Sequence, residues 1–190
     1  MAAKPPGGRR KAIDALPDAV DYVRADWARE RPDLDTSAIG VFARVSRLHA
    51  RQRALLTGLY EEYDLTLAAF DVLANLRRSG PPHRKTAGEL AESSLLTTGG
   101  VTFRLDRLEE QDLIKRVRAA GDRRVVYAQL TEHGREVIDA VIDRHAHAER
   151  EMLADLSAAE MDRLARLLKR ATASIEKYAQ RRADSGSASD

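Results

Sequence analysis

Three consecutive charged residues, Asp122-Arg123-Arg124, stand between two segments in which apolar and polar residues alternate. Those segments, residues 114–118 and 125–130, have the alternation typical of half-buried strands, and Gly121 favours a turn between them. A hairpin that carries guanidinium groups at its tip is suited to contact the phosphates of DNA. A charge run alone is often only a solvated surface, so the interpretation depends on the elements around it.

Two short helices are expected directly before this hairpin. Thr86-Ala87-Gly88-Glu89 is a capping box that opens a helix to about Ser93, and Thr97 or Thr98 is expected to cap the next one. The second helix carries apolar residues at helical spacing: Val101, Leu105 and Leu108. Two short helices in tandem before a hairpin indicate a helix-turn-helix followed by a wing.

Longer helices are expected on both sides of this region. Apolar residues at spacings of three, four and seven predict helices over residues 14–29, 37–63, 66–76, 131–153 and 157–182. The fold class is therefore mainly α with a small β wing, in a single domain over residues 12–182, with tails at 1–11 and 183–190 that offer nothing to bury. The terminal helices are amphipathic and need a partner surface.

The composition excludes several classes of protein. The 190 residues include no cysteine, which rules out disulfides and thiolate metal sites, and no metal site or cofactor is expected. The formal net charge is only +2, so a DNA-binding surface has to come from clustering of charges. The start, Met1–Lys11, contains Pro5-Pro6-Gly7-Gly8 where a signal peptide needs apolar residues, which predicts a cytoplasmic protein. The sequence carries none of the nucleotide-binding, metalloprotease or serine-nucleophile motifs, so no enzyme is expected.

The order of these motifs resembles the MarR family of bacterial regulators. Asp122-Arg123-Arg124 followed by Leu130-Thr131-Glu132-His133-Gly134 is similar to the signature of that family. The resemblance covers about residues 37–182 and implies a homodimer built from residues 36–63 and 131–182. Residues 64–130 then form a winged helix-turn-helix, which places one helix in the major groove and one wing beside the minor groove of a palindromic site.

The resemblance also implies roles for individual residues in binding double-stranded DNA. Arg124 is expected in the minor groove with Asp122 orienting it, and Arg123 is expected on phosphate. Arg84 and Lys85 are expected to be phosphate contacts near the first short helix. The remaining candidates belong to the second short helix or its cap: Thr97, Thr98, Thr102, Phe103 and Arg107. Phe103 departs from the polar residue common in the family, so it either touches a thymine methyl group or packs inward.

A narrower resemblance concerns a small-molecule effector. The added N-terminal helix, residues 12–30, is similar to that of the urate-responsive branch of the family, which implies a binding site formed by Trp27, Asp71, Arg104 and Arg116. A planar anion suits an aromatic N–H donor and guanidinium groups. Each residue also has a structural alternative: Trp27 as a surface anchor, Asp71 and Arg104 as an ion pair, and Arg116 as a phosphate contact.

We further expect Asp71 to contact Arg116, so that an anionic ligand repels Asp71 and shifts the wing. The histidines have separate expectations. His49 matches a histidine near the dimer axis in the same branch and is a candidate for pH sensing, because two imidazolium groups near the two-fold axis repel. His145 and His147 point to different sides of a helix and are interpreted, with Glu149 and Glu151, as a solvated surface.

Together these features predict a repressor that is released from DNA by a small aromatic anion, most simply urate or a related purine. Two alternatives stay open at this stage. A MarR-type regulator with a phenolic or carboxylate effector keeps the same fold, whereas a constitutive architectural DNA-binding protein shows no response to any effector.

Overall fold

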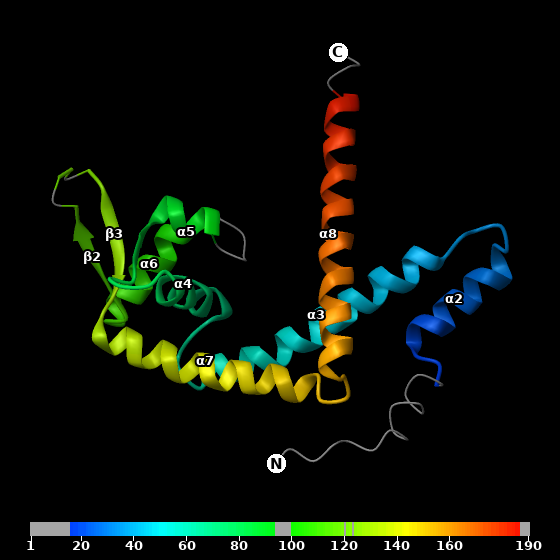
Figure 1. Ribbon diagram of the computed structural model, residues 1–190, viewed down its shortest axis with the longest axis horizontal. Helices are drawn as coiled ribbons and strands as arrows, with labels where there is room; N and C mark the ends of the chain where they lie inside the picture. The colour runs from blue at the N-terminus through cyan, green and yellow to red at the C-terminus, as the bar shows by residue number, and fades with distance from the viewer. Residues whose placement is uncertain (1–15, 94–99, 120, 123, 187–190) are drawn as a thin grey trace. The chain divides into compact units, whose positions relative to one another are not determined.

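The computed structural model describes residues 16–93, 100–119, 121–122 and 124–186. The chain divides into two compact units, Pro17–Glu149 and a second unit whose described part is Leu16 and residues 150–186. The first unit holds α2 (Ala19–Glu30), α3 (Ser37–Glu61), α4 (Leu67–Arg78), β1 (Arg84–Thr86), α5 (Ala87–Ser93), α6 (Val101–Glu110), β2 (Ile114–Arg118), β3 (Val126–Leu130) and most of α7 (Glu132–Met152) (Figure 1). The second holds α8 (Ala158–Gly186).

Within the described residues the strands form one antiparallel sheet in the order β1-β3-β2. Ile114 pairs with Leu130 and Arg118 with Val126, which confirms the hairpin expected from the alternating pattern. β1 is an addition, because Lys85 pairs with Ala128 and brings a third strand to the sheet. A strand of three residues is too short to show an alternating pattern in the sequence.

The core lies where α4, α5 and α6 meet the sheet and the first half of α7. Leu73 and Leu76 of α4, Leu90 of α5, Leu108 of α6 and Ile138 of α7 are among its most completely buried side chains. In α4, α6 and α7 these positions belong to the apolar stripes that predicted the helices, whereas α5 was predicted from its capping box. The mainly helical fold with a small wing is confirmed.

The helix boundaries follow the capping residues. Thr66, Thr131 and Ser157 cap α4, α7 and α8 as expected, each accepting a hydrogen bond from a backbone N–H three residues on. The Thr86–Glu89 capping box at α5 is confirmed in both directions, with Thr86 N–H donating to Glu89 at 2.7 Å and Glu89 N–H to Thr86 at 3.2 Å.

Three boundaries differ from the expectations. α6 begins after Gly100, whose φ of 78° is left-handed, so Thr97 or Thr98 as its N-cap is wrong, and both threonines lie outside the described residues. α2 begins only at Ala19, because Asp18 and Asp21 form a capping box there. α8 continues to Gly186, beyond Arg182, with the Ser185 hydroxyl donating to the carbonyl of Arg181.

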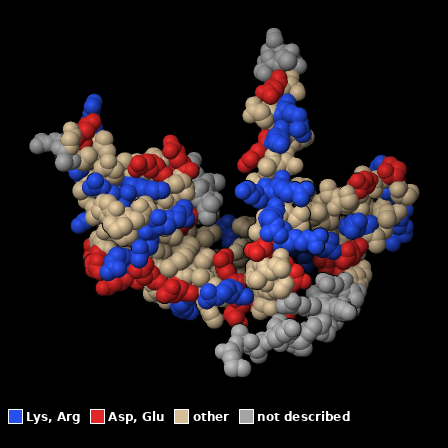
Figure 2. Space-filling view, viewed as in Figure 1, with Lys and Arg blue, Asp and Glu red and all other residues tan. Residues whose placement is uncertain are grey.

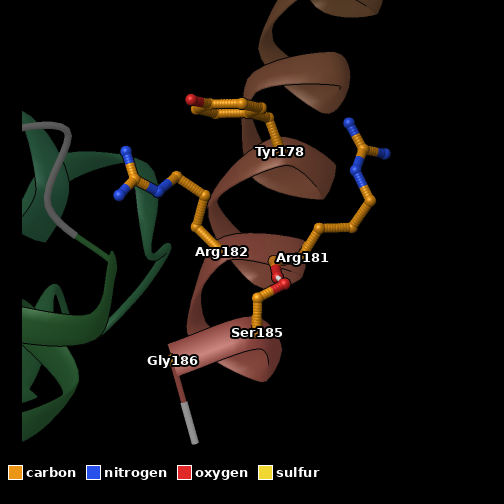
Figure 3. A pocket seen from close by; sticks show the side chains of 5 residues that line it. All are labelled: Tyr178, Arg181, Arg182, Ser185 and Gly186. Carbon is orange, nitrogen blue, oxygen red and sulfur yellow. Dashed lines mark hydrogen bonds between the residues drawn. The ribbon is translucent and has the colours of Figure 1, made fainter. Parts of the chain in front are cut away.

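The second unit is one exposed helix. None of the residues of α8 is buried, although Leu167, Leu168, Ile175 and Tyr178 recur at helical spacing along it. Figure 3 shows the end of this helix, where Arg181 and Arg182 extend to different sides below the ring of Tyr178. The hollow among these side chains is a feature of an open helix surface, and its lining residues are all exposed.

Gly134 lets α7 approach the end of α6 more closely than any side chain permits. A Cβ atom on Gly134 would lie 1.8 Å from the carbonyl oxygen of Leu113, and this neighbour is backbone that cannot rotate away. Thr131 N–H also donates to the same carbonyl at 3.2 Å. The close packing of α7 against Leu113 therefore explains why a glycine stands at the end of the 130–134 motif.

We expect Gly134→Ala to lower the free energy of unfolding by about 3 kcal/mol, because the added methyl group forces α7 away from Leu113. Denaturant unfolding followed by circular dichroism measures this. Gly88→Ala in α5 is the control, since its nearest neighbour is the Thr86 hydroxyl at 3.9 Å, and it should be neutral or stabilise by up to about 1 kcal/mol. Equal stability of Gly134→Ala and the parent would contradict the close packing.

Candidate nucleic-acid interface

α6 presents a polar and aromatic face to solvent. Val101, Leu105 and Leu108 fill its buried side, and Thr102, Phe103 and Arg107 lie exposed on the other. The Phe103 side chain is 65% exposed, which is unusual for a phenylalanine in the interior of a helix. Of the two alternatives for Phe103, inward packing is therefore wrong in this chain, and the ring is available to a partner. Thr97 and Thr98, expected beside this face, lie outside the described residues.

Within the described part of the wing, Arg124 is held by Asp122. The carboxylate of Asp122 accepts hydrogen bonds from the backbone N–H of Arg124 at 2.9 Å and from its guanidinium at 3.2 Å, and this contact lowers the pKa of Asp122. The Arg124 side chain is nevertheless 91% exposed. Asp122 thus orients Arg124 through contacts to both Nε and Nη2, while the side chain as a whole remains accessible to solvent. Arg123 lies outside the described residues.

The two expected phosphate residues of β1 have different surroundings. Arg84 is exposed and lies over the ring of Tyr127, 4.6 Å from its centroid, which leaves the edge of the guanidinium open. Lys85 points the other way: its ammonium group donates to Asn75 Oδ1 and to Ser93 Oγ, both at 2.8 Å. A phosphate role for Arg84 stays a prediction that the geometry favours, whereas Lys85 is already engaged inside the fold.

Arg116 ties the wing to α6. Its guanidinium donates to the carboxylates of Asp106 and Glu109, and its backbone N–H donates to Glu109 at 3.0 Å. These contacts, with Asp106 first, raise the pKa of Arg116. The expected contact between Asp71 and Arg116 is therefore wrong: Arg116 on β2 faces α6, and the carboxylates that hold it belong to α6.

Within one chain, Trp27 lies far from the other residues proposed to bind the effector. Asp71 is buried in α4, and Arg104 is half-buried in α6, which packs against α4. Trp27 is 44% exposed on α2, which packs on the first turns of α3, where Arg24 contacts Gly40 and Thr36. Figure 1 shows α2 at the opposite end of α3 from α4. From Gly40 to Tyr60, beside α4, the rise along α3 is about 30 Å.

A buried aromatic and polar cluster joins α3, α4 and α7. Tyr60 stacks on Phe70, with ring centroids 4.6 Å apart, and Phe70 stacks on His145 at 4.9 Å. Tyr60 Oη and His145 Nδ1 are 2.9 Å apart, while His145 Nε2 lies 3.3 Å from Glu149, which accepts from Gln52 at 2.8 Å. Burial, followed by the charges of Glu149 and Asp71, raises the pKa of Tyr60 to about 12.

The interpretation of His145 as part of a solvated surface is therefore wrong, whereas the Glu149 side chain is 40% exposed, and His147 and Glu151 are exposed as expected. Sequence reasoning missed this cluster because its members come from three separate helices. The aromatic residues at 60 and 70 and the histidine at 145 fall on the inner faces of their helices, and that helical phase was the available signal.

Charge on the surface of the first unit is mixed. Figure 2 shows Lys and Arg gathered over the region of β2, β3 and α6, with Asp and Glu along the neighbouring α7. Among the described residues, no group of three or more His, Asp or Glu side chains is placed to hold a metal ion. None of the described helices is long and apolar enough to cross a membrane.

Comparison with known proteins connects this geometry to a family. Residues 63–125 match the family model described as MarR family. The transcriptional regulator PecS of Dickeya dadantii is 35% identical over 159 residues, which cover 84% of this chain and 93% of PecS.

Solved structures share the fold. A mutant of MarR from E. coli, complexed with operator DNA, has a TM-score of 0.62 and 25% identity, covering 72% of this chain and 96% of that one. BpsR of Bordetella bronchiseptica, whose DNA binding is regulated by 6-hydroxynicotinic acid, has a TM-score of 0.61 and 22% identity, covering 73% of this chain and 96% of that one. At that identity the second likeness concerns the fold alone.

We expect Arg124→Ala to weaken binding to a specific DNA duplex by about tenfold, because one groove contact per wing is lost. Its melting temperature should be unchanged, since the side chain is almost fully exposed. Gel-shift titration at fixed salt measures the affinity, with Arg118→Ala, an exposed arginine of β2, as control. Parent-like affinity of Arg124→Ala would show that the wing does not enter the groove.

Proposed function

The chain belongs to the MarR family of DNA-binding transcriptional regulators, and on that premise we propose that it is a repressor that binds a palindromic operator as a homodimer. The observation that carries this proposal is the pairing of two exposed surfaces in one unit. Thr102, Phe103 and Arg107 project from α6, and Arg124 projects from the wing that Arg116 ties to that helix. A helix for the major groove and an arginine for the minor groove are thus held together.

Dimerisation with a second copy of the chain accounts for the apolar residues that the single chain leaves exposed. Along α3, Val41, Val45, Leu48 and Leu55 follow one face at spacings of four, three and seven and are 39% to 63% exposed. α8 adds a further apolar stripe that nothing covers in the described chain. Contiguous apolar surface of this extent marks a protein interface.

His49 lies exposed beside Leu48, where its pH-sensing role stays a prediction.

We propose further that the repressor releases DNA when it binds a small aromatic anion, with urate as the first compound to test. Arg104 and Asp71 lie in packed helices of the winged helix-turn-helix, behind the face that α6 presents. Since Trp27 lies about 30 Å away along α3 in its own chain, a site with all four residues needs Trp27 of the partner subunit. This arrangement makes effector binding a property of the dimer.

Arg116 offers the route from the effector to the groove-reading surface. It is held by two carboxylates of α6, on side chains that are one-third to one-half exposed. An anionic ligand that takes Arg116 from Asp106 and Glu109 loosens the wing from α6 and changes the spacing of the two surfaces that read DNA. The size of this response is limited by the ligand's preference for one state, typically about 1–3 kcal/mol.

The operator is found by selecting duplexes from a random pool with the parent protein, and we expect an inverted repeat whose half-sites lie about one helical turn apart. Binding of the selected duplex is then titrated with urate, xanthine, salicylate and 6-hydroxynicotinic acid. Release by the purines supports the proposed effector, and release by the phenolic or carboxylate compounds alone would replace it. DNA binding without sequence preference or effector response would indicate an architectural protein instead.

We expect Trp27→Phe and Arg104→Ala to lose urate affinity by about tenfold or more, because each removes a donor to the ligand. Calorimetry of urate binding to the parent and to each variant measures this loss. Tyr22→Phe is the control on α2, since Tyr22 is exposed and lies outside the proposed set. Parent-like urate affinity of both Trp27→Phe and Arg104→Ala would rule out this pocket.

We expect the parent to be a dimer and Leu48→Asp to shift it towards monomers, because a carboxylate in the centre of an apolar interface has no partner there. Analytical ultracentrifugation over a range of concentrations measures the equilibrium. Ser46→Asp, an exposed change on the same helix that adds the same single negative charge, is the matched control. A parent that sediments as a monomer at high concentration would contradict the proposed homodimer.

A further inference from the structure

Lys85 lies on the strand next to the proposed DNA-binding elements, yet its charge is used inside the fold. Its ammonium group donates to Asn75 Oδ1 and Ser93 Oγ, at 2.8 Å each. Asn75 is completely buried in α4, and Ser93 is the last residue of α5. We refer to these three side chains, Lys85, Asn75 and Ser93, as the Lys85 junction.

The hydrogen-bonding capacity of Ser93 is fully used in this junction. Its oxygen accepts from Lys85 and from Asn75 Nδ2, the latter at 3.0 Å, and its hydroxyl donates to the carbonyl of Glu89 one turn earlier. The backbone carbonyl of Ser93 accepts from Arg78 at 2.9 Å. Two cations thus meet the C-terminal end of α5, where helix carbonyl groups lack partners within the helix.

The three members of the junction come from three elements of the first unit: α4, β1 and α5. Asn75 belongs to α4, the helix behind α6, and Lys85 belongs to β1, which pairs with the wing strand β3. α5 precedes α6 in the chain and packs against both α4 and α6. Fixing the end of α5 to β1 and α4 therefore sets where α6 lies relative to the sheet that carries the wing.

We propose that Lys85 is a positioning residue, which acts through Ser93 and Asn75 to hold α5 and α6 in register with the wing and makes no contact with phosphate. The role rests on the proposed DNA binding, and it gives different functions to Arg84 and Lys85, which are adjacent in β1. Arg84 faces outwards over Tyr127, whereas Lys85 faces the interior. The two can be separated because a lost phosphate contact changes the salt dependence of binding and a lost internal contact does not.

The experiment compares Lys85→Met with Arg84→Met, using the duplex that the parent protein selects. We expect Lys85→Met to bind it about tenfold more weakly, with the slope of log affinity against log salt unchanged. Arg84→Met should instead lower that slope by about 0.9 for each bound subunit. Ser93→Ala is a smaller change that remains informative if Lys85→Met does not fold. Because both act on one junction, the double variant Lys85→Met/Ser93→Ala should bind no more weakly than Lys85→Met.

A measurement without DNA completes the test. Hydrogen exchange of the α5 amides should be faster in Lys85→Met and Ser93→Ala than in the parent and in Arg84→Met, because the end of α5 is released. A slope that falls in Lys85→Met as it does in Arg84→Met, or losses that multiply in the double variant, would overturn the proposal. If the parent selects no duplex, the proposed function fails, and unchanged exchange in α5 is then the result that separately refutes the role of Lys85.

Discussion

The proposed recognition helix α6 ends at a short turn before the wing, and the first turn of α7 presses against the backbone of that turn. Asp112 there has a φ of 54°, and the N–H of Leu113 donates back to Leu108 of α6 at 2.9 Å. Thr131 donates its backbone N–H to Leu113 and its hydroxyl to the carbonyl of Asp112. Gly134 permits this approach, so the angle between α6 and the wing is set from behind by α7.

Polar contacts in the winged region fall into two groups with different consequences. Arg116, Asp106 and Glu109 are partly exposed, and ion pairs of this kind contribute up to about 1 kcal/mol each, so a ligand or a phosphate exchanges with them at small cost. Asn75 is fully buried, and leaving its amide without a partner costs about 1–3 kcal/mol. The first group suits a response to an effector, and the second keeps the proposed recognition helix in place.

The apolar side chains also fall into two groups, those buried within one chain and those left exposed. The core between α4, α6 and the sheet is closed within one chain, with Leu73, Leu76 and Ile138 completely buried. The apolar stripes of α3 and α8 are left exposed in the described chain, and the proposed dimer would cover them. In the proposed dimer α3 and α8 carry the subunit contact, and α2, which packs on α3, brings Trp27 to the effector site of the other subunit.

The sequence by itself determined the helices and the wing hairpin, because those depend on local patterns, while the resemblance to a family supplied the candidate DNA-binding residues. The period of Val101, Leu105 and Leu108, the alternation in the wing, and the Thr86 and Ser157 capping boxes each correspond to an element of the structure. Only the tertiary structure decided which charges meet. Arg116 pairs with α6 and not with Asp71, Lys85 turns inward, and His145 joins a buried stack. These pairings link residues up to 85 positions apart, and the orientation of a side chain towards them depends on how the helices pack, which no local spacing encodes.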